Sequence, residues 1–87
     1  MNIKMKFVPR NAFDEYYLVP IDESAAKFNG LIQINEVSSY IFEVLPECET
    51  EEDIVDKVLE MYEVDRETAQ KDISAFLNIL RENEIID

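Results

Sequence analysis

The chain has 87 residues, enough for one domain with a single small hydrophobic core. Twenty acidic residues against eight basic ones give a net charge of −12, and the sequence has no histidine. This balance excludes nucleic acid and anionic membranes as partners, because lysine and arginine supply the attraction to both. The charge is unevenly placed: residues 1–35 are neutral, and residues 36–87 carry the whole excess of acid.

Three strands are predicted before residue 35, where runs rich in aromatic and β-branched residues alternate with turn residues. They are Phe7–Arg10, Tyr16–Val19 and Leu31–Ile34, separated by a turn at Asp14-Glu15 and by a polar loop over Asp22–Asn29. Because proline has no backbone N–H, Pro9 predicts that the first strand lies at a sheet edge or is interrupted. The pair Asn29-Gly30 turns the chain into the third strand.

After Asn35 the hydrophobic period becomes helical, and three helices are predicted. Asn35, Thr50 and Asp65 are the expected N-caps, because their side-chain oxygens can accept hydrogen bonds from the free amides of a first helical turn. The apolar stripes are Val37, Tyr40, Ile41, Val44 and Leu45 in the first helix, Ile54, Val55, Val58, Leu59 and Tyr62 in the second, and Ala69, Ile73, Phe76, Leu77 and Leu80 in the third.

These elements predict an α+β, winged-helix-like fold, with three N-terminal antiparallel β-strands followed by three α-helices. Residues 1–87 are expected to form one domain. Pro46 ends the first helix, because proline cannot continue it, and the third helix ends before Asn83. Ile85 and Ile86 are expected to pack back onto the core.

The sequence offers little for catalysis, so the protein is predicted not to be an enzyme. Its serines have no histidine partner for triad chemistry, and a single glycine excludes glycine-rich phosphate loops. No cofactor or metal site is expected, because the usual zinc-binding clusters of histidine and cysteine are missing. Cys48 lies between Glu47 and Glu49, whose charges would raise its pKa, and is interpreted as an ordinary free thiol.

The predicted location is the cytoplasm. One cysteine cannot form an internal disulfide, which favours a reducing compartment. The first six residues lack the apolar core and cleavage site of a signal peptide. No apolar run approaches the ~18 residues of a membrane span.

The third predicted strand supports two interpretations. Leu31 and Gln33 share one face, and Ile32 and Ile34 share the other, as expected of a short core strand with the two isoleucines inward. The strand also contains no lysine or proline, the residues that usually protect an exposed edge. An unprotected edge can accept an additional strand from a peptide.

The order of motifs resembles the PqqD family over nearly the whole chain. The matching residues are Asn29–Glu36, Ile41-Phe42 and Leu45, then Thr50, Ile54-Val55, Tyr62, Val64, Asp72-Ile73, Phe76-Leu77 and Leu80, preceded by Phe7-Val8, Arg10 and Tyr17–Pro20. Departures from the family pattern are Ile34 in place of leucine, Ile73 in place of valine and Glu84 in place of glycine.

The resemblance implies a non-catalytic adaptor in the biosynthesis of ribosomally made, modified peptides. Members of the family bind the leader segment of a precursor peptide and present it to a modifying enzyme, often a radical S-adenosylmethionine (radical SAM) protein. The leader lies as an extra strand against the third strand, in a groove shared with the third helix. The partners expected here are therefore a leader peptide and such an enzyme. A homodimer through the same strand edge is a further expectation.

Carried over to this sequence, the resemblance implies a set of peptide-binding residues. They are Leu31, Ile32, Gln33, Ile34 and Asn35 on the strand, and Lys71, Asp72, Ala75, Asn78, Ile79 and Glu82 on the third helix. Asp72 either pairs with a basic leader residue or is a solvated or internally paired carboxylate. Ile79 belongs either to the core or to the groove, and the groove is favoured. Arg10 is expected to form an ion pair within the strand hairpin.

Two other functions fit parts of the sequence. Size and acidity agree with a carrier protein resembling an acyl carrier, although no Asp-Ser-Leu motif begins a helix. The predicted outline also fits a winged-helix regulator, which would have to act through protein contacts because of its charge. The acidity of residues 36–87 predicts that partners on the helical side present basic residues.

Overall fold

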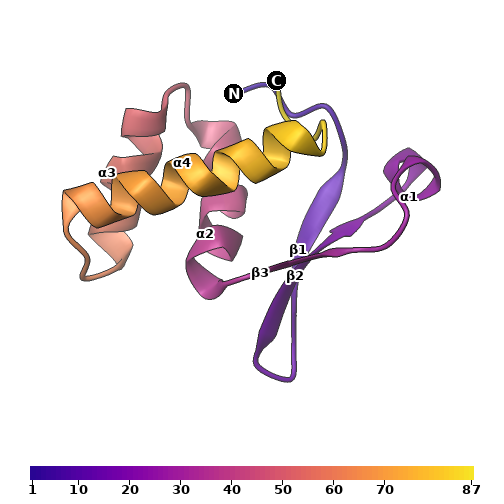
Figure 1. Ribbon diagram of the computed structural model, residues 1–87, viewed down its shortest axis with the longest axis horizontal. Helices are drawn as coiled ribbons and strands as arrows, with labels where there is room; N and C mark the ends of the chain where they lie inside the picture. The colour runs from indigo at the N-terminus through magenta and orange to yellow at the C-terminus, as the bar shows by residue number, and fades with distance from the viewer.

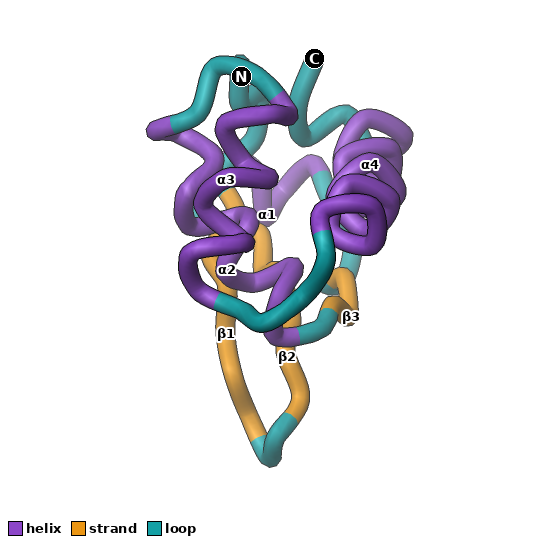
Figure 2. Tube along the Cα trace, turned by 90° about the vertical axis from the view of Figure 1, so that its left-hand side faces the viewer, coloured by secondary structure: helices purple, strands orange, loops and turns teal.

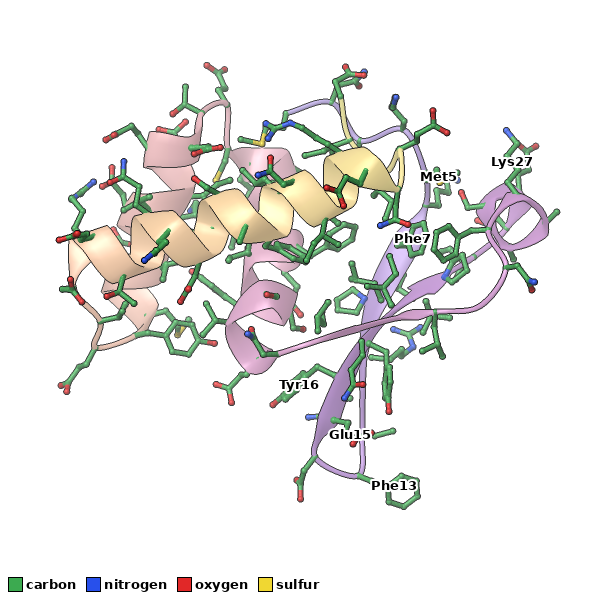
Figure 3. All side chains as sticks on the ribbon, viewed as in Figure 1. Met5, Phe7, Phe13, Glu15, Tyr16 and Lys27 are labelled. Atoms are coloured by element: carbon green, nitrogen blue, oxygen red, sulfur yellow. The ribbon has the colours of Figure 1, made fainter.

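Three antiparallel strands form a sheet in the order β1–β2–β3 in the computed structural model, which describes residues 1–87. The strands are β1 (Phe7–Ala12), β2 (Glu15–Pro20) and β3 (Ile32–Ile34). A two-residue turn at Phe13-Asp14 joins β1 to β2, one residue earlier than predicted. The hairpin projects away from the helices, and Phe13 points into solvent at its tip (Figures 1 and 3).

The three predicted helices are present, with the expected N-caps. They are α2 (Glu36–Val44), α3 (Glu51–Met61) and α4 (Arg66–Glu82), and a short 3-10 helix, η1 (Leu45–Glu47), extends α2. The Asn35 side chain accepts a hydrogen bond from the Ser38 amide at 2.8 Å. Thr50 and Asp53 cap each other reciprocally, and the backbone amides that donate to Asp53 lower the pKa of its carboxyl.

The region predicted as a loop over Asp22–Asn29 instead contains a short helix, α1 (Glu23–Lys27). Helical periodicity could not show it, because five residues with two alanines have no apolar stripe. Tertiary contacts hold it in place. The buried Ser24 hydroxyl accepts a hydrogen bond from the Lys6 amide at 2.8 Å, and Phe28 packs edge to face on Phe7. The order is thus two strands, a short helix, a third strand and three longer helices.

The hydrophobic core lies between the sheet and the helices, with α4 across α2 and α3 (Figures 1 and 2). Ile73, Leu77 and Leu80 contribute the fully buried face of α4. The prediction for the C-terminus is confirmed: Ile85 and Ile86 are buried, and Ile86 pairs with Ile3. None of the helices combines the length and apolar character that crossing a bilayer requires.

The prediction for Arg10 is wrong, whereas the prediction for Cys48 is confirmed with a different main cause of its pKa shift. Arg10 forms no ion pair; its guanidinium is exposed and donates to the Pro9 carbonyl at 3.1 Å. Cys48 is buried, as a free thiol, and its pKa is raised mainly by burial rather than by its acidic neighbours. Lys57 acts in the opposite direction and lowers that pKa. The thiol packs within the core.

Candidate functional site

Strand β3 forms one edge of the sheet, and only its inner side is paired. Its register places Ile32 opposite Leu18, Gln33 opposite Tyr17, and Ile34 opposite Tyr16 in β2. Ile32 and Ile34 pack partly buried against the core, whereas Gln33 is exposed. The isoleucines therefore serve the core, as the first interpretation of this strand expects, while the outer edge of the strand is unpaired.

The register also shows which backbone groups of β2 face β3. Opposed residues in an antiparallel ladder alternate between pairs that exchange both hydrogen bonds and pairs that exchange none. Pro9 is opposite Leu18, and Pro20 is opposite Phe7. Because proline has no N–H, both are non-bonded pairs. The N–H and C=O of Leu18 must therefore point toward β3, where they meet Ile32.

The same alternation assigns the outer edge of β3 to Gln33. Tyr17, which is opposite Gln33, directs its own backbone groups toward Arg10 in β1. The N–H and C=O of Gln33 consequently point away from β2. The guanidinium bond to the Pro9 carbonyl agrees with this pattern, because that oxygen is not used by β2. An added strand would find a backbone donor and acceptor at Gln33.

A groove with a volume of about 420 Å³ runs beside this edge. Its walls come from the end of β3, the first turns of α2 and the middle of α4. The lining residues are Gln33, Ile34, Asn35, Val37, Ser38, Ile41, Asp72, Ala75, Phe76 and Ile79. Figure 2 shows α4 and β3 on the same side of the molecule. The groove is mostly apolar and open to solvent.

The structure brings part of the predicted site together in this groove. Gln33, Ile34, Asn35, Asp72, Ala75 and Ile79 line it, whereas Leu31, Ile32, Lys71, Asn78 and Glu82 do not. The side chain of Ile79 is 42% exposed and lines the groove. Asp72 is exposed and forms no ion pair with another side chain, so an internal ion pair does not explain it.

Four lining residues were not among the predicted peptide-binding positions: Val37, Ser38, Ile41 and Phe76. Val37, Ile41 and Phe76 belong to the helical apolar stripes and were assigned to the core. Phe76 and Ile41 are indeed buried, so one surface of each closes the core while another reaches the groove floor. For Val37, the sequence signal for a place in the groove is its position in the first helical turn directly after the third strand.

Glu36, at the start of α2, lies in sequence between two groove residues, Asn35 and Val37, but does not itself line the groove. Its carboxylate accepts a hydrogen bond from the Tyr16 hydroxyl at 3.4 Å. Burial, and then the nearby Glu36 charge, raise the pKa of Tyr16. Among the residues that line the groove, Asp72 is the only one with a charged side chain.

A second and larger hollow, of about 670 Å³, lies between α1 and the segment before β1. Met5 and Lys27, which both line it, appear at this end of the molecule in Figure 3. Three lysines and three carboxylates line it, and Lys6 pairs with Asp22 at 3.7 Å. Its charges balance internally, and it contains a single hydrophobic residue. Unlike the groove, it has no strand residue in its lining.

The sequence over residues 15–86 matches the family of coenzyme PQQ synthesis protein D (PqqD). The chain belongs to the PqqD family. This span begins at β2 and includes every element that lines the groove. The predicted resemblance and α+β fold are thus confirmed. No curated protein matches the sequence.

Two solved structures share the fold of this PqqD-family chain. In the complex of TbiB1 with the TbiA(beta) leader peptide, the protein is 29% identical, with a TM-score of 0.70 covering 100% of this chain and 95% of that chain. A lasso peptide synthetase B1 complexed with the leader peptide is 20% identical, with a TM-score of 0.65 covering 95% of this chain and 94% of that chain. At 20% identity the second likeness shows the fold alone.

Proposed function

We propose that this protein binds the leader segment of a ribosomally synthesised precursor peptide as an extra β-strand beside β3 and presents it to a modifying enzyme. The observation that carries the proposal is the unpaired outer edge of β3 next to an apolar groove. Backbone bonds along such an edge give affinity that tolerates different sequences, and pockets for alternate side chains give register and selectivity.

The comparisons support this function because TbiB1 is complexed with a leader peptide and resembles this chain along its full length. The groove offers the same two kinds of contact that strand addition needs. Gln33 supplies a backbone donor and acceptor, and Ile34, Phe76 and Ile79 supply apolar surface. Ile34 reaches the groove from a strand, and Phe76 and Ile79 reach it from a helix.

The protein acts as an adaptor without catalysing a reaction. Its groove contains one carboxylate, Asp72, and neither a nucleophile paired with a base nor a cluster of metal ligands. The modifying chemistry therefore belongs to a separate enzyme, for which we infer the radical SAM class from membership of the PqqD family. The adaptor raises the local concentration of the precursor beside that enzyme.

A titration followed by NMR tests the proposal. The probe is a synthetic peptide covering the leader of the short precursor encoded beside this gene, added to the ¹⁵N-labelled full chain. Amide signals of residues 31–35 and of α4 should shift, with the largest change at Gln33. Saturating peptide that shifts neither region would overturn the proposal.

A matched pair of variants tests whether the leader binds in the groove. Ile79→Asp puts a charge into the apolar groove and should weaken leader binding about tenfold or more, because an unpaired carboxylate would have to be desolvated. Met61→Asp makes the same change at an exposed position of α3 that does not line the groove. It should leave the affinity within twofold. Fluorescence polarisation with labelled leader measures both, and equal losses would contradict the assignment.

The open edge of β3 also fits a second copy of the chain, so a homodimer and the leader would compete for Gln33. Sedimentation of the free chain at increasing concentration should reveal the dimer, and saturating leader should dissociate it. A dimer that persists with leader bound would place its interface elsewhere.

A further inference from the structure

The groove combines an apolar floor with a single charged side chain at its wall. Ile34, Val37, Ile41, Phe76 and Ile79 supply the apolar surface. The charge belongs to Asp72 in the first half of α4.

Nothing within the chain neutralises that carboxylate. Asp72 is exposed, and no lysine or arginine pairs with it. Glu36 is engaged by the Tyr16 hydroxyl and does not line the groove. Lys71 precedes Asp72 in the helix but points elsewhere on its surface, since adjacent helical residues do not face each other. A ligand in the groove therefore meets one negative charge.

The spacing along α4 can be converted into a spacing along a bound strand. Asp72 and Phe76 are four residues apart, which is about 6 Å of helix rise. Alternate residues of an extended peptide are about 6.8 Å apart and face the same side. Figure 1 draws α4 and the segment around β3 running in a similar direction, and Figure 2 places both on the same side of the molecule. In a strand that runs along α4 beside β3, a side chain two positions from the one on the apolar floor would therefore reach Asp72.

We infer that the groove selects an extended peptide in which a lysine or arginine lies two positions from a large apolar residue. The inference rests on the proposed function and specifies the chemistry of its ligand. The apolar residue enters the floor beside Phe76 and Ile79, and the basic residue pairs with Asp72. The −12 net charge attracts such a peptide from a distance and would repel an acidic one.

A library selection tests this specificity without knowledge of the natural leader. Random dodecapeptides are displayed and selected on the full chain and, in parallel, on Asp72→Asn and Asp72→Lys variants. The wild type should enrich a basic residue two positions from an apolar one. Asp72→Asn should keep the apolar preference and lose the basic one, and Asp72→Lys should enrich Asp or Glu at that position.

Affinities of individual selected peptides then give the size of the effect. Changing the basic residue to glutamine should weaken binding to the wild type about two- to fivefold, as expected for an exposed ion pair, and should leave binding to Asp72→Asn unchanged. Glu60→Gln is the matched control, because it removes one helical negative charge from a residue outside the groove. It should retain the preference for the basic residue.

The outcomes separate the inference from the proposed function. If selected peptides shift the Gln33 amide but show no basic preference, or if Asp72→Lys enriches the same peptides, the inference is wrong and strand addition stands. If Glu60→Gln abolishes the preference as fully as Asp72→Asn, net charge rather than Asp72 is responsible, and the inference is again overturned. If no selected peptide perturbs β3 or α4, both fail together.

Discussion

The two edges of the sheet differ in the backbone hydrogen-bonding groups that they offer to an additional strand. On the β1 edge, the outward backbone positions are Phe7, Pro9 and Asn11, and the central one, Pro9, has no N–H and accepts the Arg10 guanidinium at its carbonyl oxygen at 3.1 Å. On the β3 edge, the outward position is Gln33, whose donor and acceptor are both free. The β1 edge is thus interrupted by a proline at its centre, a device that monomeric β-proteins commonly use, and the β3 edge is not.

The surroundings of the edges differ as well. The groove adjoins β3, and no residue of β1 lines either hollow of the molecule. β3 is only three residues long, so its backbone alone offers few hydrogen bonds. Affinity for an added strand would therefore have to come from the open edge and the apolar groove together. An edge without proline and an apolar groove beside it therefore occur together only at β3.

The largest expected effect comes from making β3 resemble β1. Gln33→Pro removes the outward N–H and places a proline ring on the edge, while the inward hydrogen bonds belong to Ile32 and Ile34 and are kept. Ile32, the preceding residue, is already extended, as proline requires. Leader affinity measured by fluorescence polarisation should fall about tenfold or more, through the lost hydrogen bond and the steric block.

The control for this variant is Gln33→Thr, which changes the side chain and keeps the backbone N–H. It should bind leader within about twofold of the wild type. Circular dichroism and urea denaturation establish that both variants fold. If folded Gln33→Pro bound leader as tightly as the wild type, the peptide would not be using the β3 edge.

Much of this arrangement could be predicted from the sequence, because the signals are local. N-caps at Asn35, Thr50 and Asp65 followed by apolar stripes located three helices, and the absence of lysine or proline in residues 31–34 indicated an open edge. The direction of the Gln33 backbone could not be predicted in this way. It follows from Pro9 and Pro20 only once the register of the sheet is known.

The features that sequence patterns missed depend on tertiary contacts. Helix α1 is held by Ser24 and Phe28, each through a partner distant in sequence. Ile41 and Phe76 fit a core stripe and also form the groove floor, and periodicity cannot separate two surfaces of one side chain. The charge of Arg10 suggested an ion pair, but the sequence does not show that its guanidinium binds the Pro9 carbonyl instead.

A smaller effect should come from the turn that connects the protected edge to the middle strand. Phe13 and Asp14 have φ values of 53° and 64°, the left-handed region that costs non-glycine residues about 1–2 kcal/mol each. The Phe13 side chain is 98% exposed and packs on nothing. The double variant Phe13→Asn, Asp14→Gly supplies the preferred residues for such a turn. It should raise the free energy of unfolding by about 1–2 kcal/mol in urea denaturation.

This variant also sharpens the comparison of the edges, because it stabilises the hairpin without touching β3. Leader affinity should stay within twofold of the wild type. Phe13→Ala, which removes the ring and keeps the left-handed backbone strain, should change the unfolding free energy by less than about 0.5 kcal/mol. A gain in leader affinity that follows hairpin stability would mean that binding depends on the order of the whole sheet.

The smallest expected effect comes from opening the protected edge. Pro9→Thr restores the central outward N–H on β1, so neither edge is then interrupted by proline. If an open edge were sufficient, calorimetry would show a second leader bound per chain. We expect one, with affinity within twofold of the wild type, because no apolar groove adjoins β1 to receive alternate side chains. The same substitution in Gln33→Pro should not restore binding, since backbone groups alone cannot replace the floor formed by Phe76 and Ile79.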